Sequence, residues 1–191
     1  MQREIRLTEA SIARRPPPAP AQLVGVVRHA ATWRLAVPSQ LEVLVKVDGG
    51  QDDVDRYVVH VDADAFYLAM LRKVRVLRTS AHGSTCMARR DMPRDYKYAR
   101  AAAGFAHSAT SPVPLAQPVV GVDGQGRLQV DFNDGITRTY WLLANGCSSF
   151  PVEVHGRQDA YVLAKHAGVG IECFADLFAT GAVHASSTAA A

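Results

Sequence analysis

The sequence predicts a mixed α/β (α+β) fold, and three observations support this class. Apolar and polar residues alternate in short stretches that are typical of strands, such as residues 128–132. Other apolar residues recur at helical spacing after a strand, as in residues 136–143. Apolar residues make up 48% of the 191 residues and charged residues 20%, which predicts a packed core rather than global disorder.

The N-terminal part is expected to contain a flexible segment and a small β-rich module. Residues 1–22 end in the run Arg-Arg-Pro-Pro-Pro-Ala-Pro, which predicts a flexible, proline-rich segment. Residues 23–29 and 41–47 have the pattern of strands. Residues 57–61 return as a strand after a turn rich in aspartate and glycine, so a hairpin with 41–47 is expected. Together these elements predict an N-terminal α/β module over residues 23–78.

A helix is expected after the last strand of this module. Asp62 or Asp64 can cap its start, and apolar residues from Phe66 onward give it one apolar face. His60, Asp62 and Asp64 also alternate as metal ligands on a strand can. The capping interpretation is preferred, because aspartates at a strand end cap a following helix more often than they bind a metal.

The rest of the chain predicts a C-terminal domain over residues 79–183, followed by a disordered tail at residues 184–191. Residues 94–103 are expected to form a short helix that follows a proline and ends at Gly104. Residues 119–132 have the pattern of two strands around a Gly-Gln-Gly turn.

Residues 127–155 read as one strand–turn–helix–strand unit, and its turn is the main candidate site. Gly135 lets the backbone fold tightly, and the first amides of the following helix carry the positive end of its dipole. Thr137 adds a hydroxyl and Arg138 adds a fork of guanidinium donors. These residue types can form a phosphate cradle. The alternative interpretation, which the same spacing fits, is a capped helix with an exposed arginine.

Basic residues are concentrated in one part of the chain. The formal net charge is +3, but residues 72–100 hold nine basic and two acidic residues, a local net charge of +7 against −4 elsewhere. This asymmetry suggests a polyanionic partner such as DNA or a nucleotide, and a solvated basic face is the open alternative. The residues expected to contact DNA are Arg75, Arg78, Arg89 and Arg90.

Several classes of protein are not expected. The three cysteines are far apart and the seven histidines lack metal-binding spacing, so neither a disulfide framework nor a structural zinc site is predicted. No apolar run approaches the roughly 20 residues that cross a bilayer. The first residues lack the apolar region of a secretory signal. We therefore expect a cytoplasmic protein without a membrane span.

The candidate turn also resembles a known superfamily. Three segments are similar to the GxxR signature region of the ParB/sulfiredoxin superfamily: Asp134-Gly135-Ile136-Thr137-Arg138, a helix ending in Asn145-Gly146, and Phe150-Pro151-Val152-Glu153-Val154. A wider set is similar to plasmid fertility-inhibition factors, cytoplasmic proteins by which a resident plasmid blocks conjugative export of another. That set is Arg90-Asp91-Met92-Pro93, Lys97-Tyr98, Gly104-Phe105, Pro112-Val113-Pro114-Leu115-Ala116 and the turn with Thr139. The resemblance covers residues 88–180 and implies a ParB/sulfiredoxin-like C-terminal domain.

The resemblance implies a phosphate site at this turn. Gly135 stands at the close-approach glycine, and Arg138 stands at the clamp that holds nucleotide or DNA backbone phosphate in the superfamily. A helix before the signature supplies a second phosphate contact, which makes candidates of Arg94, Lys97 and Arg100. Thr137 stands where sulfiredoxin has a histidine and Ile136 where it has its reactive cysteine, so sulfiredoxin activity is not expected.

Some fertility-inhibition relatives are credited with ATP hydrolysis and DNA cleavage, which need a positioned water or a metal beside the clamp. The candidates for catalysis are Asp134, Arg138 and Glu153. The candidates for holding Mg²⁺ next to ATP or another nucleotide are Asp131 and Asp134. Asp134 can instead cap the helix, and Glu153 can be an exposed strand residue.

We expect the protein to act in plasmid fertility inhibition and to suppress conjugative, type IV secretion DNA transfer. It would handle ATP and DNA phosphates at the GxxR turn, with ATPase or DNase activity left open. The expected partners are DNA and a conjugative coupling protein or secretion ATPase. Two alternatives are a non-enzymatic ParB-like DNA-binding module and a protein-interaction module that blocks the coupling protein by binding alone.

Overall fold

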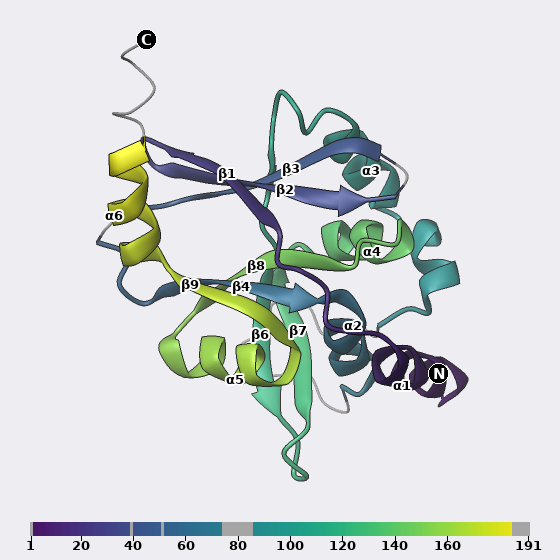
Figure 1. The fold of residues 1–191 in the computed structure, drawn as a ribbon. Coiled ribbons are helices and arrows are strands. Elements are labelled where there is room, and N and C mark those ends of the chain that lie inside the picture. The colour runs from purple at the N-terminus through teal and green to yellow at the C-terminus, as the bar shows by residue number, and fades with distance from the viewer. Residues whose placement is uncertain (1, 39, 51, 74–85, 185–191) are drawn as a thin grey trace.

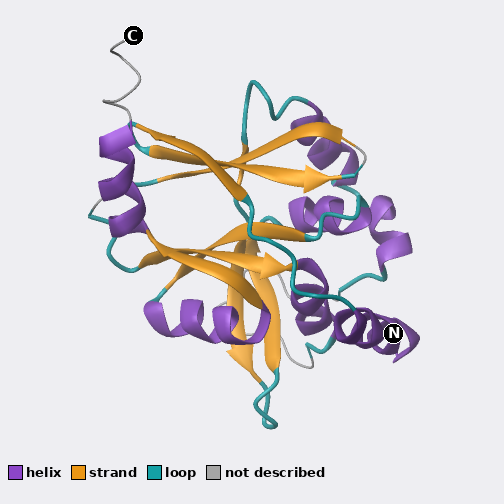
Figure 2. Ribbon diagram, viewed as in Figure 1, coloured by secondary structure: helices purple, strands orange, loops and turns teal. Residues whose placement is uncertain are grey.

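The computed structural model describes residues 2–38, 40–50, 52–73 and 86–184, and three β-sheets with surrounding helices make up these ranges (Figure 1). Figure 2 shows the strands running through the middle of the molecule and the helices at its periphery. The mixed α/β class is therefore confirmed. Among the helices of the described residues, none is long and apolar enough to cross a membrane.

The first sheet has the strand order β1-β2-β3-β5. β1 (Gln22–Val27), β2 (Ala30–Val37) and β3 (Gln40–Asp48) form an antiparallel meander, and the short β5 (Val113–Pro114) runs parallel to β3. β2 is a strand that the sequence analysis missed. Its signal is present in the sequence, because alternate residues are apolar and buried: Ala31, Trp33, Leu35 and Val37.

The second sheet has the order β8-β4-β9, with both pairings antiparallel. β4 (Arg56–Asp62) lies between β8 (Ser149–His155) and β9 (Gly168–Cys173). The predicted hairpin of residues 41–47 with 57–61 is therefore wrong, since β3 pairs with β2 and β5 instead. β4 is buried from Tyr57 to Asp62, which suits a central strand covered on both faces and not one half of a two-stranded hairpin.

The third sheet is the hairpin of β6 (Gln117–Val122) and β7 (Leu128–Asp134), which confirms the strands expected there. Its turn projects away from the rest of the molecule in Figure 1. The register shifts near the open end, where Gln117 pairs with Asp134 and Pro118 pairs with Phe132. Asn133 is thus an extra residue in β7, a bulge immediately before the candidate turn.

The helices are α1 (Gln2–Arg14), α2 (Ala63–Leu71), α3 (Tyr98–Ala106), α4 (Ile136–Ala144), α5 (Arg157–Ala167) and α6 (Phe174–His184), with a 3₁₀ helix η1 (Arg89–Arg94). The unit expected over residues 127–155 is confirmed as β7, α4 and β8. Residue 184 ends α6, whereas the rest of the predicted tail, residues 185–191, lies outside the described residues.

The N-terminal residues differ from the expected flexible segment, because residues 2–14 form helix α1. This helix packs against α2, and the Tyr67 hydroxyl donates a 2.9 Å hydrogen bond to Glu4. Arg15 pairs with Asp62 at 2.6 Å and with Asp64 at 3.2 Å. Only the proline-rich run that follows α1 lacks helix and strand, in residues 16–21.

The start of α2 confirms the capping interpretation. The Asp62 carboxylate accepts hydrogen bonds from the backbone amides of Asp64 and Ala65. Asp64 accepts hydrogen bonds from Ser11, Arg15 and Arg89, which tie α1, α2 and η1 together. Within the described ranges, no three His, Cys, Asp or Glu residues are grouped so that they could hold a metal ion.

One hydrophobic core joins the predicted N-terminal module to the predicted C-terminal domain. β4 comes from residues 23–78, yet its neighbours β8 and β9 come from residues 79–183. Phe66 of α2 packs edge-to-face against Phe132 and Phe150, with ring centroids 6.1 and 5.7 Å apart. The division at residue 78 thus reflects a change in the sequence pattern, whereas the hydrophobic core contains residues from both sides of it.

Candidate functional site

The turn between β7 and α4 requires glycine for two structural reasons. Gly135 has φ of +89°, a left-handed conformation that a side chain disfavours. A Cβ built on Gly135 would also lie 2.6 Å from the Ala116 Cα. The end of β7 therefore lies so close to Ala116, just before β6, that a side chain at position 135 would not fit. Gly135 is the N-cap of α4.

A cleft of about 590 Å³ opens between this turn and α3. It brings together the predicted phosphate residues from two separate parts of the sequence, with α3 and the residues before β5 forming the opposite wall. Those predicted residues are Lys97, Arg100, Gly135, Thr137 and Arg138. The structure therefore places five of the six predicted phosphate residues on one surface.

Two helices begin at this cleft, and both favour an anion there. Neither α3 nor α4 has a side-chain hydrogen bond at its N-cap or an acidic residue in its first turn. Lys97 is the N-cap of α3 and Arg100 lies in its first turn, so cations are placed where the helix dipole is already positive. A negatively charged ligand would offset the repulsion between these cations and the positive end of the helix dipole. Backbone amides and cations could bind that ligand together.

Arg138 is held by the protein itself in this structure. Its Nη2 donates to Asp134 Oδ2 at 2.7 Å and to the Leu115 carbonyl at 3.2 Å. Asp134 Oδ1 accepts from the Gly135 amide at 2.8 Å. The Asp134 carboxylate thus occupies donors that a phosphate could use.

Burial alone would raise the pKa of Asp134, but Arg138, the Gly135 amide and Lys97 outweigh it and lower that pKa below its ordinary value. The Asp134 carboxylate is therefore charged near neutral pH. The alternative that Asp134 caps α4 is wrong, because the N-cap is Gly135 and has no side-chain hydrogen bond.

Thr137 links the two walls of the cleft. Its hydroxyl donates to Asp95 Oδ1 at 3.2 Å, and the same oxygen accepts from the Lys97 amide at 2.9 Å. Asp95 therefore holds the start of α3 next to the first turn of α4.

The helix predicted over residues 94–103 is shifted in the structure. Arg94 ends η1, α3 begins at Tyr98, and Gly104 lies inside α3 instead of ending it. The reason is the extended backbone of Asp95, with ψ of 135°, which separates the two helices. Arg94 consequently lies outside the cleft lining and pairs with Asp91 at 3.2 Å.

The predicted DNA-binding arginines have different surroundings. Arg89 pairs with Asp64 and lies over the Tyr67 ring at 4.7 Å, so it is engaged within the fold. Arg90 is 85% exposed. Arg75 and Arg78 lie outside the described residues.

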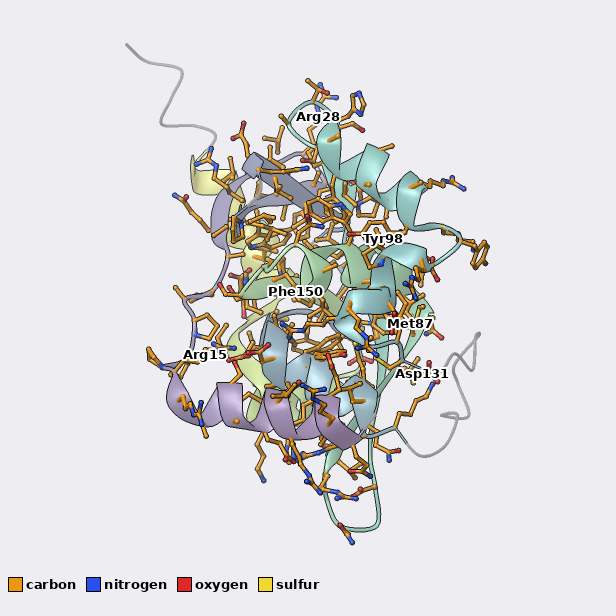
Figure 3. The ribbon with its side chains drawn as sticks, turned by 90° about the vertical axis from the view of Figure 1, so that its right-hand side faces the viewer. Arg15, Arg28, Met87, Tyr98, Asp131 and Phe150 are labelled. Atoms are coloured by element: carbon orange, nitrogen blue, oxygen red, sulfur yellow. The ribbon has the colours of Figure 1, made fainter. Side chains whose placement is uncertain are left out.

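The three predicted carboxylates do not meet at the turn. Asp131 is buried in an ion pair with Lys73 at 2.9 Å. In Figure 3 it lies well away from Tyr98, the first residue of α3. Glu153 is also buried, with Arg56 at 2.6 Å and Gln117 at 3.0 Å, so the exposed-strand alternative is wrong. Asp134 alone supplies a carboxylate to the cleft lining within the described part of the chain.

Three residues that were not predicted from the sequence also line the cleft: His107, Ser111 and Asn133. His107 follows α3, and its Nδ1 lies 2.8 Å from the Ala103 carbonyl. No spacing rule connects these residues to the GxxR turn, because they converge only after α3 packs against α4. The bulge at Asn133 is the exception, since the Asn-Asp-Gly sequence indicates an irregular strand end.

Comparisons with known proteins identify the family to which the chain belongs. A family model for the plasmid fertility inhibition factor matches residues 58–168, a range that contains α3, the GxxR turn and α4. The chain belongs to the plasmid fertility inhibition factor family. It is 38% identical over 154 residues to the protein osa of Shigella flexneri, and the aligned part covers 78% of this chain and 77% of that protein.

A solved structure extends the likeness to the whole fold. The gold(I) cyanide derivative of an oncogenic suppression activity protein, described as a plasmid fertility inhibition factor, has a TM-score of 0.79 and 33% sequence identity with this chain. The match covers 93% of this chain and 92% of that one, so it includes residues N-terminal to the range of the family model. The family predicted from the GxxR turn and its surroundings is thus confirmed.

Proposed function

We propose that this plasmid fertility inhibition factor acts by binding nucleotide, with ATP as the leading candidate, and DNA backbone phosphate in the cleft between α3 and the GxxR turn. The observation that carries the proposal is the convergence of Lys97, Arg100 and Arg138 in one cleft of about 590 Å³ with the start of α4, whose N-cap makes no side-chain hydrogen bond. Phosphate oxygens match this donor set, because guanidinium groups, ammonium groups and free helix amides all favour anions. A cleft of this size also fits a small ligand such as a nucleotide.

The residues present fit a magnesium ion that accompanies a nucleotide. Mg²⁺ in proteins commonly has one or two carboxylate ligands together with substrate phosphates and water. Asp134 would hold the ion, because its side chain is 66% exposed and lies beside the proposed phosphate position. Asp131 fits this role less well, because its carboxylate is buried against Lys73. When bound, the ion would neutralise phosphate charge and support ATPase or DNase activity.

Binding without turnover is the second candidate, and one observation favours it. Glu153 is engaged with Arg56 and Gln117 outside the cleft lining, so Asp134 has no second carboxylate beside it among the described lining residues. A protein of this kind would occupy DNA, or a conjugative coupling protein or secretion ATPase of the type IV system, and block transfer by occupancy alone.

Replacing Arg138 with alanine tests the proposed site. Loss of a charge-assisted hydrogen bond costs about 1.5–3 kcal/mol, which corresponds to an approximately 10- to 150-fold weaker binding of ATP. Arg127→Ala is a matched control, because Arg127 also pairs with an aspartate four residues away, but in the β6–β7 turn. Binding is measured by isothermal titration with and without Mg²⁺, after urea unfolding has shown that both variants fold.

Hydrolysis of ATP and nicking of plasmid DNA are measured with the same three proteins. Activity lost only in Arg138→Ala supports the enzymatic form of the proposal. Binding without turnover in the wild type selects the second candidate. If Arg138→Ala binds ATP as tightly as Arg127→Ala does, the cleft is not the nucleotide site.

A further inference from the structure

Tyr96, between η1 and α3, is unusually exposed for an aromatic residue. The residue is 84% exposed, the highest value among the exposed large apolar residues that the structure describes. Single exposed apolar residues are common on protein surfaces, so exposure by itself indicates nothing. The charged residues near Tyr96 suggest a role for this exposed side chain.

Exposed cations lie close to Tyr96 along the chain, and one of them contacts its ring. Lys97 Nζ lies 5.1 Å from the ring centroid, close enough for a cation–π contact. The side chains of Arg90 and Arg94 are 85% and 80% exposed. Asp91 pairs with both arginines, so the surface formed by Arg90, Arg94, Tyr96 and Lys97 keeps a positive balance. We call it the Tyr96 surface.

The Tyr96 surface is continuous with the cleft and held rigidly beside it. Lys97 belongs to both, since it neighbours Tyr96 and lines the cleft together with Arg100. Asp95 accepts hydrogen bonds from the Thr137 hydroxyl and the Lys97 amide, so the residues on either side of Tyr96 are tied to α4. A chain of phosphates could therefore run from Arg90 and Arg94 past Tyr96 toward Arg138.

We propose that the Tyr96 surface binds single-stranded DNA, with a base stacked on the Tyr96 ring and successive phosphates led by Arg94 and Lys97 into the cleft. This inference rests on the proposed function, because it assigns the form of DNA that reaches the same site. An exposed aromatic ring beside a basic groove is the arrangement that binds single strands without sequence preference. A duplex buries the faces of its bases in the stack, so Tyr96 has no base to stack on there.

Replacing Tyr96 with alanine tests the stacking contact. A labelled oligothymidine and a hairpin duplex of equal nucleotide number are titrated with each protein, and fluorescence anisotropy reports binding. Tyr96→Ala is expected to weaken binding of the single strand about tenfold. Tyr96→Phe keeps the aromatic face and is expected to stay within about twofold of the wild type. Tyr161→Ala is the matched control, because Tyr161 is 57% exposed but lies on α5.

Salt dependence tests the phosphate contacts separately. Each phosphate contact that is lost reduces the slope of log affinity against log salt concentration by about 0.7 for a single strand. Arg94→Ala is expected to lower the slope by that amount, whereas Tyr96→Ala leaves it unchanged, because tyrosine carries no charge. Arg127→Ala again serves as the control for an arginine in an aspartate pair away from the surface.

Three results would overturn the inference: equal single-strand binding by Tyr96→Ala and the wild type, an equal loss for duplex and single strand, or no binding of single strands by the wild type. Binding of ATP is measured on every variant, so failure here can be separated from failure of the proposed function. ATP binding that survives in Tyr96→Ala and is lost in Arg138→Ala leaves the cleft proposal standing even when the Tyr96 proposal fails.

Discussion

Replacing Gly135 with alanine adds one methyl group to the turn between β7 and α4. The left-handed backbone of Gly135, with φ of +89°, costs an L-residue about 1–2 kcal/mol. The new Cβ would lie 2.6 Å from the Ala116 Cα and 2.7 Å from its Cβ, so the backbone must move. Overpacking of this kind costs about 1–3 kcal/mol, and the two effects together predict a loss of roughly 2–5 kcal/mol.

Gly126→Ala separates the two contributions. Gly126 also has a left-handed backbone, with φ of +72°, but a Cβ there would meet nothing within 4 Å. Its replacement should cost only the conformational part, about 1–2 kcal/mol. The difference between the two variants therefore measures the close approach of the turn to Ala116.

Equilibrium unfolding in urea, followed by circular dichroism, gives both free energies, provided that the m-value stays unchanged. The same proteins are then titrated with ATP, because a displaced turn also moves the donors of Gly135 and Arg138. Equal stabilities of Gly135→Ala and Gly126→Ala would refute the reasoning, since the contact with Ala116 would then carry no energetic cost.

The remaining predictions concern buried groups. Asp131→Ala leaves Lys73 buried without this carboxylate and should cost about 3–5 kcal/mol, whereas the double variant Asp131→Leu/Lys73→Met should recover most of that loss in urea unfolding. Arg34→Ala breaks an exposed pair with Glu42 and should cost under about 1 kcal/mol, so a similar cost at Asp131 would contradict the role of burial. Burial raises the pKa of the Cys86 and Cys147 thiols from 9.0 to about 12, so both should resist a disulfide reagent at pH 8 until the protein unfolds, while the half-buried Cys173 reacts first. Because those pKa values are raised, the thiols' contribution to stability is complete below pH 9.0 and is lost progressively as the pH rises from 9.0 toward about 12. Unfolding curves between pH 8 and pH 10 that show no decrease would be inconsistent with this.

Elements whose hydrogen bonds are local could be predicted from the sequence. The β6–β7 hairpin closes around a glycine-rich turn, Asp62 caps the helix that begins at the next residue, and Gly135 follows one strand and caps the next helix. Each depends on residue types within a few positions of each other, which is the range over which periodicity and capping rules apply. The family also followed from local motifs around the turn.

The choice of long-range partners was decided by the tertiary structure. β4 has the pattern of any buried strand, and nothing within residues 57–61 shows that it lies between β8 and β9 and not beside β3. Likewise, Asp131 and Glu153 read as carboxylates near the turn, yet Lys73 and Arg56 bind them in the packed protein. Burial of a charge requires an opposite charge, and that partner comes from a distant part of the chain.

The candidate site depends both on the local sequence and on tertiary packing. The residue types at the turn, glycine, hydroxyl and arginine, are determined by the sequence and indicate an anion. The second wall of the cleft and the place of Tyr96 beside the cleft exist only after α3 and α4 pack together. Packing of side chains between separate elements is a cooperative property of the whole core, which a local sequence pattern does not contain.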